Sequence, residues 1–190
     1  MGKPEFKYIT QEEYLDAERL ATEKHEYFEG EIFAMSGASI PHNIIFRNTF
    51  GELINKLKGK SCQPFGSDLR IFIPENTLYT YPDLSIICGE VETTDDNFDT
   101  ATNPTVLIEI LSESTRGYKE GAKSTLYRKI KSLQKYIMID SEQMMVIKQI
   151  RNKDNSWLLT EYTGSDQTFK LESMQVELQL SEIYEGVKFN

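Results

Sequence analysis

The sequence is short of cysteine, histidine and long apolar runs. It has two cysteines and two histidines among 190 residues. Cys62 and Cys88 are too few for a disulfide framework, and with His25 and His42 they make a poor zinc site. We therefore expect two reduced core thiols in a cytoplasmic protein. No apolar run reaches the length of a membrane span and the first four residues open no secretory signal, so we expect no membrane association.

The sequence also lacks the common catalytic motifs. No glycine-rich phosphate loop, nucleophile elbow or zinc-protease helix is present, so nothing supports a P-loop nucleotidase, a serine hydrolase or a zinc enzyme. No repeat, low-complexity tract or linker divides the chain. At 190 residues it suits one domain with a sizeable core, and we expect a single domain over residues 1–190.

Positive charge is scarce overall and concentrated in one segment. The formal net charge of −9 argues against a broadly basic nucleic-acid-binding surface. Arg116 to Lys135, however, holds seven Lys or Arg and one acid, which gives this segment +6 and leaves −15 on the other 170 residues. The segment is either a solvated helix face or a cluster that neutralises phosphates. Its candidate nucleic-acid contacts are Lys119, Arg128 and Lys131.

Hydrophobic periodicity predicts an α/β fold. Helices are expected at 11–20, 41–58, 119–132 and 180–184. Strands are expected at 69–73, 82–88, 106–111 and 135–139, with hairpins over 25–35 and 144–162 and a last short strand in the tail. Residues 74–81 read as a turn, and 89–104 as a solvated acidic loop, with a metal cluster as the alternative. We therefore expect a mixed central β-sheet flanked by helices, with an additional β-hairpin region.

The helix over 41–58 is predicted to bury one apolar stripe. The stripe consists of Phe46, Phe50, Leu53, Ile54 and Leu57. His42 lies on the same side in the first turn, where a histidine is either a satisfied core residue or a contact to the functional site or a phosphate.

Glu109 is the only charge in the apolar run 106–111, which reads as a buried strand. Alternation places Leu107, Glu109 and Leu111 on one face, so the carboxylate cannot turn to water without exposing its neighbours. An ionised carboxylate there is costly unless a cation, hydrogen bonds or a metal compensates it. The alternatives are a buried structural salt bridge and a functional group, and the pattern favours function.

Asp83 begins a second apolar run, 84–88. A Pro-Asp pair is also a common turn opening, so Asp83 gains its interest from Glu109. Two acids on adjacent strands of a buried sheet offer a hard divalent cation oxygen ligands on a rigid scaffold. This pair is where the sequence places the chemistry.

Lys123 is predicted on the inward edge of its helix, between Ile130 and Tyr127. A lysine there needs an anionic partner, unless its stem packs at the boundary and its ammonium reaches water. Asp68 alternates outward from its strand and is either a third acid or a solvated residue. Glu29, in the turn of the first hairpin, completes the accessory candidates.

Several segments together resemble the Uma family of endonucleases, in the PD-(D/E)XK superfamily. They are Tyr81-Pro82-Asp83-Leu84, residues 103–112 with Ile108-Glu109-Ile110-Leu111-Ser112, residues 118–127 and Gln134-Lys135-Tyr136. The resemblance covers nearly the whole chain and includes residues 29–31 and 66–70.

The resemblance implies a restriction-endonuclease-like core and Mg²⁺-dependent hydrolysis of DNA phosphodiester bonds, with Mn²⁺ as a substitute. By analogy Asp83, Glu109 and the Ile110 carbonyl would bind the metal, which would activate water and stabilise charge on the scissile phosphate. The superfamily also has a lysine two residues after the glutamate, and here that position is Leu111. Either a lysine arrives from elsewhere, with Lys123 best placed, or the site is impaired.

Two functions therefore stand at this point. One is a Mg²⁺-dependent endonuclease with Asp83, Glu109 and Lys123 as catalytic residues. The other is a non-cleaving DNA-binding or protein-interaction domain that retains the nuclease fold. DNA is the expected partner, and we expect the chain to form a homodimer.

Overall fold

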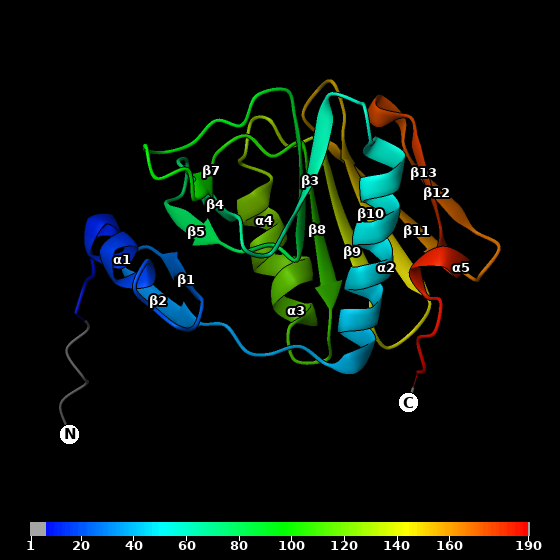
Figure 1. The fold of residues 1–190 in the computed structure, drawn as a ribbon, viewed down its shortest axis with the longest axis horizontal. Coiled ribbons are helices and arrows are strands. Elements are labelled where there is room, and N and C mark those ends of the chain that lie inside the picture. The colour runs from blue at the N-terminus through cyan, green and yellow to red at the C-terminus, as the bar shows by residue number, and fades with distance from the viewer. Residues whose placement is uncertain (1–6, 190) are drawn as a thin grey trace.

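A six-stranded mixed sheet forms the centre of the protein, as the computed structural model of residues 7–189 shows (Figure 1). The strand order is β11-β10-β9-β8-β6-β3, in which β8 and β9 are parallel and the other neighbours are antiparallel. The strands are β3 Cys62–Gly66, β6 Leu84–Cys88, β8 Val106–Leu111, β9 Lys135–Asp140, β10 Met145–Arg151 and β11 Trp157–Thr163. The predicted mixed central sheet is confirmed.

Helices cover both faces of this sheet (Figure 1). One face packs against α2 (Ile40–Leu57) together with α5 (Leu180–Ile183) and the hairpin of β12 (Thr168–Leu171) and β13 (Val176–Gln179), which a 3₁₀ turn, η2 (Glu172–Met174), connects. The other face packs against a continuous helix over residues 116–127, composed of α3 (Arg116–Tyr118), the π-helical η1 (Lys119–Lys123) and α4 (Ser124–Tyr127). No helix in residues 7–189 is long and apolar enough to cross a bilayer.

The alternation of β8 fixes the side on which Glu109 lies. Val106, Ile108 and Ile110 belong to the core beneath α2, whereas Leu107 and Leu111 belong to the core beneath the 116–127 helix. Glu109 shares the face of Leu107 and Leu111 because side chains alternate along a strand. The predicted assignment of faces is confirmed, and it aims a buried carboxylate at the helix that carries the lysines.

A second, five-stranded sheet of order β2-β1-β5-β4-β7 adjoins the helix 116–127. Its strands are β1 His25–Phe28, β2 Glu31–Ala34, β4 Arg70–Ile73, β5 Leu78–Thr80 and β7 Thr100–Ala101. The turn between β1 and β2 contains Glu29 and Gly30, both with positive φ, so the predicted hairpin is confirmed. Helix α1 (Gln11–Glu18) covers this sheet and begins with a capping box of Thr10 and Glu13. This sheet delivers Glu26 of β1 to the site described below.

Several predicted boundaries were wrong. The third helix runs over 116–127, not 119–132, and residues 74–81 contain β5 as well as a turn. The buried stripe of α2 is rotated from the predicted one: Ile45 and Thr49 are buried, whereas Ile54 is 48% exposed. The rotation follows from packing against β8 and the C-terminal hairpin, which the periodicity of α2 alone does not contain.

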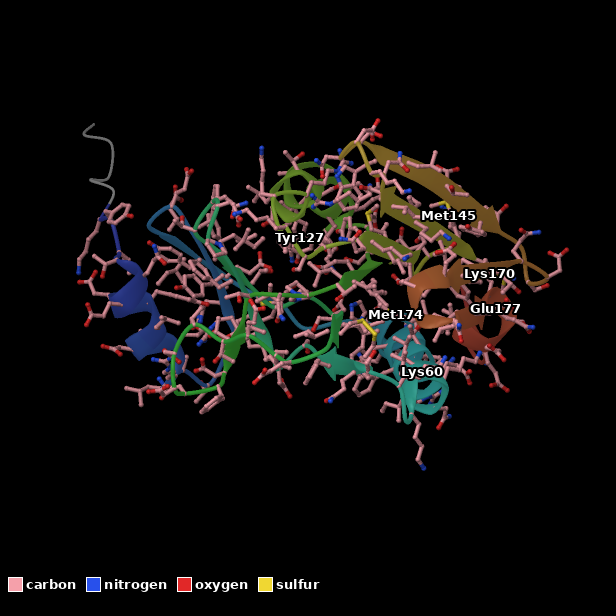
Figure 2. All side chains as sticks on the ribbon, turned by 90° about the horizontal axis from the view of Figure 1, so that it is seen from above. Lys60, Tyr127, Met145, Lys170, Met174 and Glu177 are labelled. Atoms are coloured by element: carbon pink, nitrogen blue, oxygen red, sulfur yellow. A yellow bond between two sulfur atoms is a disulfide. The ribbon has the colours of Figure 1, made fainter. Side chains whose placement is uncertain are left out.

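The expectation of two reduced thiols is also wrong. Cys62 and Cys88 lie directly opposite each other in the β3–β6 pair and form a disulfide, drawn as a yellow bond in Figure 2. Sequence periodicity missed β3 because Gln63 and Pro64 interrupt its apolar pattern. Proline is tolerated there because β3 is an edge strand.

Candidate active site

Asp83 and Glu109 meet where β6 and β8 run side by side. Leu84 pairs with Ile108 across these antiparallel strands, which brings the residue before β6 beside Glu109. The Asp83 Oδ2 accepts a hydrogen bond of 2.7 Å from the backbone N–H of Ile110. The carboxylate of Asp83 is therefore fixed by the same strand that carries Glu109.

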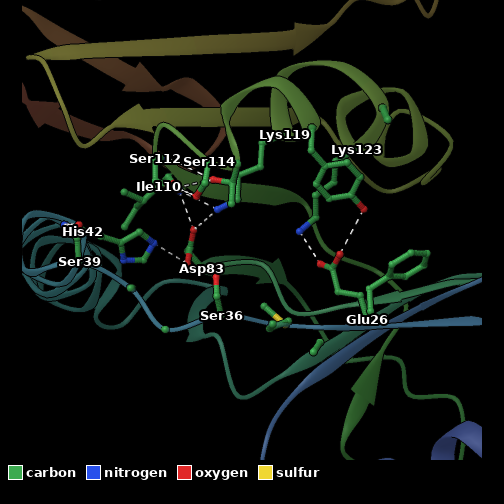
Figure 3. Close-up of a pocket in the computed structure, with 18 of the residues that line it drawn as sticks. Glu26, Ser36, Ser39, His42, Asp83, Ile110, Ser112, Ser114, Lys119 and Lys123 are labelled. Carbon is green, nitrogen blue, oxygen red and sulfur yellow. Dashed lines mark hydrogen bonds and ion pairs between the residues drawn. The ribbon is translucent and has the colours of Figure 1, made fainter.

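The ammonium of Lys119 joins the two acids, and its contact with Asp83 is drawn in Figure 3. Its Nζ lies 3.0 Å from Asp83 Oδ2 and 2.8 Å from Glu109 Oε2. It also donates to the carbonyl oxygen of Ile110 at 2.9 Å. Two carboxylate oxygens and one carbonyl oxygen thus converge on a single cation position.

Lys123 is the second cation of the site. Its Nζ lies 2.9 Å from Glu109 Oε1 and 2.6 Å from Glu26 Oε1, and the contact with Glu26 is drawn in Figure 3. The side chain is 3% exposed, so this lysine does not extend to solvent. The ammonium of Lys123 thus lies beside the carboxylate of Glu109, and the catalytic role of Lys123 stays a prediction.

Three residues of the site were not assigned to it from the sequence. Glu26 accepts hydrogen bonds from Thr80 and from Tyr118 Oη in addition to the contact with Lys123. The Tyr127 hydroxyl donates to Glu109 Oε1 at 2.7 Å. Lys119, predicted to contact nucleic acid, is instead held between the two acids. We call Glu26, Asp83, Glu109, Lys119 and Lys123 the Glu109 cluster.

The geometry of the 116–127 helix explains why one carboxylate receives three contacts. Lys119, Lys123 and Tyr127 follow at four-residue intervals and all reach Glu109. The segment that contains both lysines is π-helical, a wider turn that is frequently found at functional sites. The spacing of the three residues was readable in the sequence, but the π turn was not.

Mutual charge keeps the buried groups ionised. Burial alone would lower the pKa of Lys123, but the carboxylates of Glu109 and Glu26 outweigh it and raise that pKa above its ordinary value. Burial likewise opposes the charge of Lys119, and Glu109 and Asp83 raise its pKa. Burial would raise the pKa of Asp83, yet the hydrogen bond with His42 and the charge of Lys119 hold it well below its usual range. Lys119, Lys123 and Asp83 therefore carry their charges near neutral pH.

Four members of the cluster, Glu26, Asp83, Lys119 and Lys123, line a cavity of about 660 Å³, whereas Glu109 is not among the lining residues. The segment 33–39 and the side chains of Phe28 and Leu126 provide apolar lining, and Ser112, Ser114 and Thr115 add hydroxyl groups. Asp83, Lys119 and Lys123 all line this space. A ligand in the cavity therefore has access to both lysines and to Asp83.

His42 belongs to the site and the other two accessory candidates do not. The His42 Nε2 lies 3.1 Å from Asp83 Oδ1 (Figure 3), and its buried Nδ1 has no hydrogen-bond partner among the described residues. Asp68, by contrast, is 97% exposed and pairs with Lys24, and Glu29 is exposed in the β1–β2 turn. Both lie in turns, their side chains are exposed and neither lines the cavity, so their accessory role stays a prediction that this geometry does not support.

The basic segment 116–135 does not form one surface. Lys119 and Lys123 face Glu109, Arg116 lies 2.7 Å from Asp140, and the buried Lys135 lies near Glu172. Of the other predicted nucleic-acid contacts, Arg128 and Lys131 are exposed, but neither lines the cavity. Tertiary packing has thus divided the excess positive charge between the site and the surface.

The oxygen donors fit a hard divalent cation. Carboxylate and backbone carbonyl oxygens are the protein ligands that Mg²⁺ and similar ions take, and here they converge from two adjacent strands. Within residues 7–189 no three His, Cys, Asp or Glu side chains gather as a metal cluster, so the acidic loop holds none and Asp83 and Glu109 depend on the Ile110 carbonyl. A metal fits this donor set in the place of the Lys119 ammonium.

The architecture is that of the restriction-endonuclease-like proteins. The crystal structure described as that of "a putative nuclease belonging to DUF820", from Anabaena variabilis ATCC 29413, is similar to the chain with a TM-score of 0.74. The similarity covers 93% of this chain and 97% of that one, with 19% sequence identity. At that identity the likeness establishes the fold.

Sequence comparisons identify the family. Residues 11–182 match the Uma2 family, whose description is "Putative restriction endonuclease". Two relatives from Synechocystis sp. (strain ATCC 27184 / PCC 6803 / Kazusa) have the names uncharacterized protein slr1290 and uncharacterized protein sll1609. The first is 35% identical over 97% of this chain and 95% of its own, and the second is 36% identical over 90% and 96%. The chain belongs to the Uma2 family.

Proposed function

We propose that this protein is a metal-dependent nuclease that hydrolyses phosphodiester bonds in DNA. The observation that carries the proposal is the convergence of Asp83 Oδ2, Glu109 Oε2 and the Ile110 carbonyl on one cation position beside a cavity. The descriptions of the family and of the similar crystal structure both name nucleases and support this chemistry.

Asp83, Glu109 and the Ile110 carbonyl are the groups that would hold Mg²⁺, or Mn²⁺ in its place. The bound ion would supply an activated water and would stabilise negative charge on the scissile phosphate. Asp83 is prepared for this role because the Ile110 N–H and His42 fix its orientation. Glu109 is prepared because the sheet buries it and leaves it 1% exposed.

Lys123 supplies the positive charge that Leu111 does not. Its ammonium has three N–H donors, of which Glu26 and Glu109 engage two. These two contacts leave the third N–H to donate to a water or a phosphate oxygen in the cavity, which Lys123 lines. Lys123 therefore orients and polarises the attacking water in this proposal.

Cleavage assays on single-stranded, linear duplex and supercoiled DNA, with Mg²⁺ or Mn²⁺, test the proposal. We expect the wild type to cleave at least one of these forms, and Asp83→Ala and Glu109→Gln to lose the activity while remaining folded. Lack of cleavage by the wild type on every form, or an equal rate in Asp83→Ala, would contradict it.

A non-cleaving domain that binds DNA or a protein is the second candidate. Two observations favour it: Leu111 stands where the superfamily has its lysine, and the Lys119 ammonium fills the cation position. Binding of DNA without cleavage in the same assays would select this candidate. Assembly as a homodimer stays a prediction, which analytical ultracentrifugation tests.

A further inference from the structure

Lys119 lies where a metal ion is proposed to bind, although the charge pattern of its segment predicted a contact with nucleic acid. We infer that Lys119 is an internal counter-ion that competes with the divalent ion for the Asp83–Glu109 site and so sets the affinity of that site. The inference rests on the proposed function in one respect: it takes the three converging oxygens as metal ligands.

The contacts of Lys119 are those of a cation in a cage of oxygens. Its Nζ has three oxygen neighbours, at 3.0 Å on Asp83, 2.8 Å on Glu109 and 2.9 Å on the Ile110 carbonyl. Each is a hard oxygen that a divalent ion prefers. One position cannot hold both an ammonium and a metal ion, because two cations would then share the same three oxygens.

The charge balance of the cluster also favours exchange over joint occupancy. Three carboxylates face two ammonium groups, so their formal charges sum to −1. A divalent ion in the place of Lys119 brings the sum to zero. The ion together with the ammonium would leave an excess positive charge in a partly buried site, which is unfavourable.

Lys119 can leave the cage, whereas Lys123 is anchored. The Lys119 side chain is 12% exposed and lines the cavity, and a lysine ammonium is a compact charge on a flexible stem. Lys123 is 3% exposed and is held by Glu26 from a different sheet. The two lysines therefore have different roles: Lys123 is a fixed member of the site, and Lys119 is the member that the metal displaces.

Calorimetric titration of Mn²⁺ into the full chain tests the inference. Lys119→Met retains the stem and removes the charge, and we expect it to bind Mn²⁺ roughly tenfold or more tightly than the wild type, because the competing cation is gone. Adding Asp83→Asn to this variant should abolish the gain. Equal or weaker binding by Lys119→Met would overturn the inference.

Lys131→Met is the matched control. Lys131 is 90% exposed and lines no part of the cavity, so this variant makes the same change in net charge at a distance. We expect its Mn²⁺ affinity to equal that of the wild type. An equal gain in both variants would mean that overall charge, not the cage, controls binding, and would overturn the inference.

The melting temperature provides a second readout, which also shows whether the Lys119 variant folds. Without Lys119 the carboxylates of Asp83 and Glu109 lose a cation, so Lys119→Met should melt at a lower temperature in EDTA, and Mn²⁺ should raise its Tm more than that of the wild type. If this variant does not fold, Lys119→Gln serves for the same comparison. Tighter Mn²⁺ binding without DNA cleavage would refute the nuclease proposal and leave this inference intact. DNA cleavage together with unchanged Mn²⁺ binding by Lys119→Met would refute this inference and leave the nuclease proposal intact.

Discussion

Arg70 and Lys119 are both buried or nearly buried cations, and they are held in different ways. Arg70 directs its guanidinium to three separate partners: Nε to Thr100 Oγ1 at 2.9 Å, Nη1 to the Tyr81 hydroxyl at 2.9 Å, and Nη2 to Asp99 at 3.0 Å. Lys119 directs one atom to three oxygens, two of them ionised. Arg70 does not line the cavity of about 660 Å³, whereas Lys119 does.

The difference separates a structural ion cluster from a candidate site. A guanidinium is a planar fork whose donors point in fixed directions, so no spherical ion can replace it. An ammonium among converging oxygens occupies a position that such an ion can take. Burial and ion pairing are common to both clusters, and therefore neither property by itself indicates function. The convergence of oxygens beside a cavity is the property that distinguishes the candidate site from the Arg70 cluster.

The largest effect that this comparison predicts is on catalysis. Lys123→Met should reduce DNA cleavage by roughly 100- to 10,000-fold, the usual contribution of a group that assists proton transfer. Arg70→Met should leave the rate constant of the folded fraction unchanged. Both expectations are checked by measuring the cleavage rate of each variant and dividing it by the folded fraction, which circular dichroism gives. A similar loss in the two variants would make Lys123 a structural residue only.

Removing the cation should lower the free energy of unfolding in both clusters, but a metal ion should restore stability only to the Lys119 variant. Removing the cation from a buried ion pair costs about 3–5 kcal/mol of unfolding free energy, and we expect Arg70→Met to lie in this range. Lys119→Met should lose less in the presence of Mn²⁺ than in EDTA. Urea unfolding under both conditions measures the difference. If Mn²⁺ restores Arg70→Met equally, the two clusters do not differ in the way proposed.

Two tyrosines provide a smaller, paired test. Tyr127→Phe removes the hydrogen bond to Glu109, and Tyr81→Phe removes the one to Glu18 at 2.9 Å together with the one that Tyr81 accepts from Arg70. A hydrogen bond to a charged group contributes about 1.5–3 kcal/mol, so both variants should lose stability of that order. Only Tyr127→Phe should also lower the cleavage rate. An unchanged rate in Tyr127→Phe would exclude a role for its hydroxyl in positioning Glu109.

The smallest predicted effect concerns the exposed basic residues. Reversing Arg128 and Lys131 to Glu should weaken DNA binding without unfolding the chain and should reduce its salt dependence, because each phosphate contact adds about 0.9 to the slope of log K against log salt. Fluorescence anisotropy at several salt concentrations measures this. Unchanged affinity would mean that these side chains are only a solvated surface.

The sequence was sufficient for the parts of the site that rest on local pattern. Glu109 was found because it interrupts an apolar strand, Asp83 because it opens the adjacent one, and Lys123 because of its position on a helical wheel. The structure brings all three together. Each of these signals lies within one element or two neighbouring ones.

Features that depend on distant packing were not predictable in this way. Glu26 reaches the site from a hairpin 97 residues before Lys123, and nothing in that hairpin marks it as a site residue. Lys119 was assigned to the surface because its segment is rich in basic residues, and the π turn that presents it to Glu109 leaves no sequence signal. The disulfide was missed because β3 itself was missed.

The most direct test of the account is the position of a bound metal. Crystals of the Lys119→Met variant grown with Mn²⁺ can be studied by anomalous diffraction, which locates the ion independently of its effect on activity. The account predicts one strong peak within coordination distance, about 2–2.6 Å, of Asp83, Glu109 and the Ile110 carbonyl oxygen. A peak elsewhere, or none at this position at saturating Mn²⁺, would contradict it.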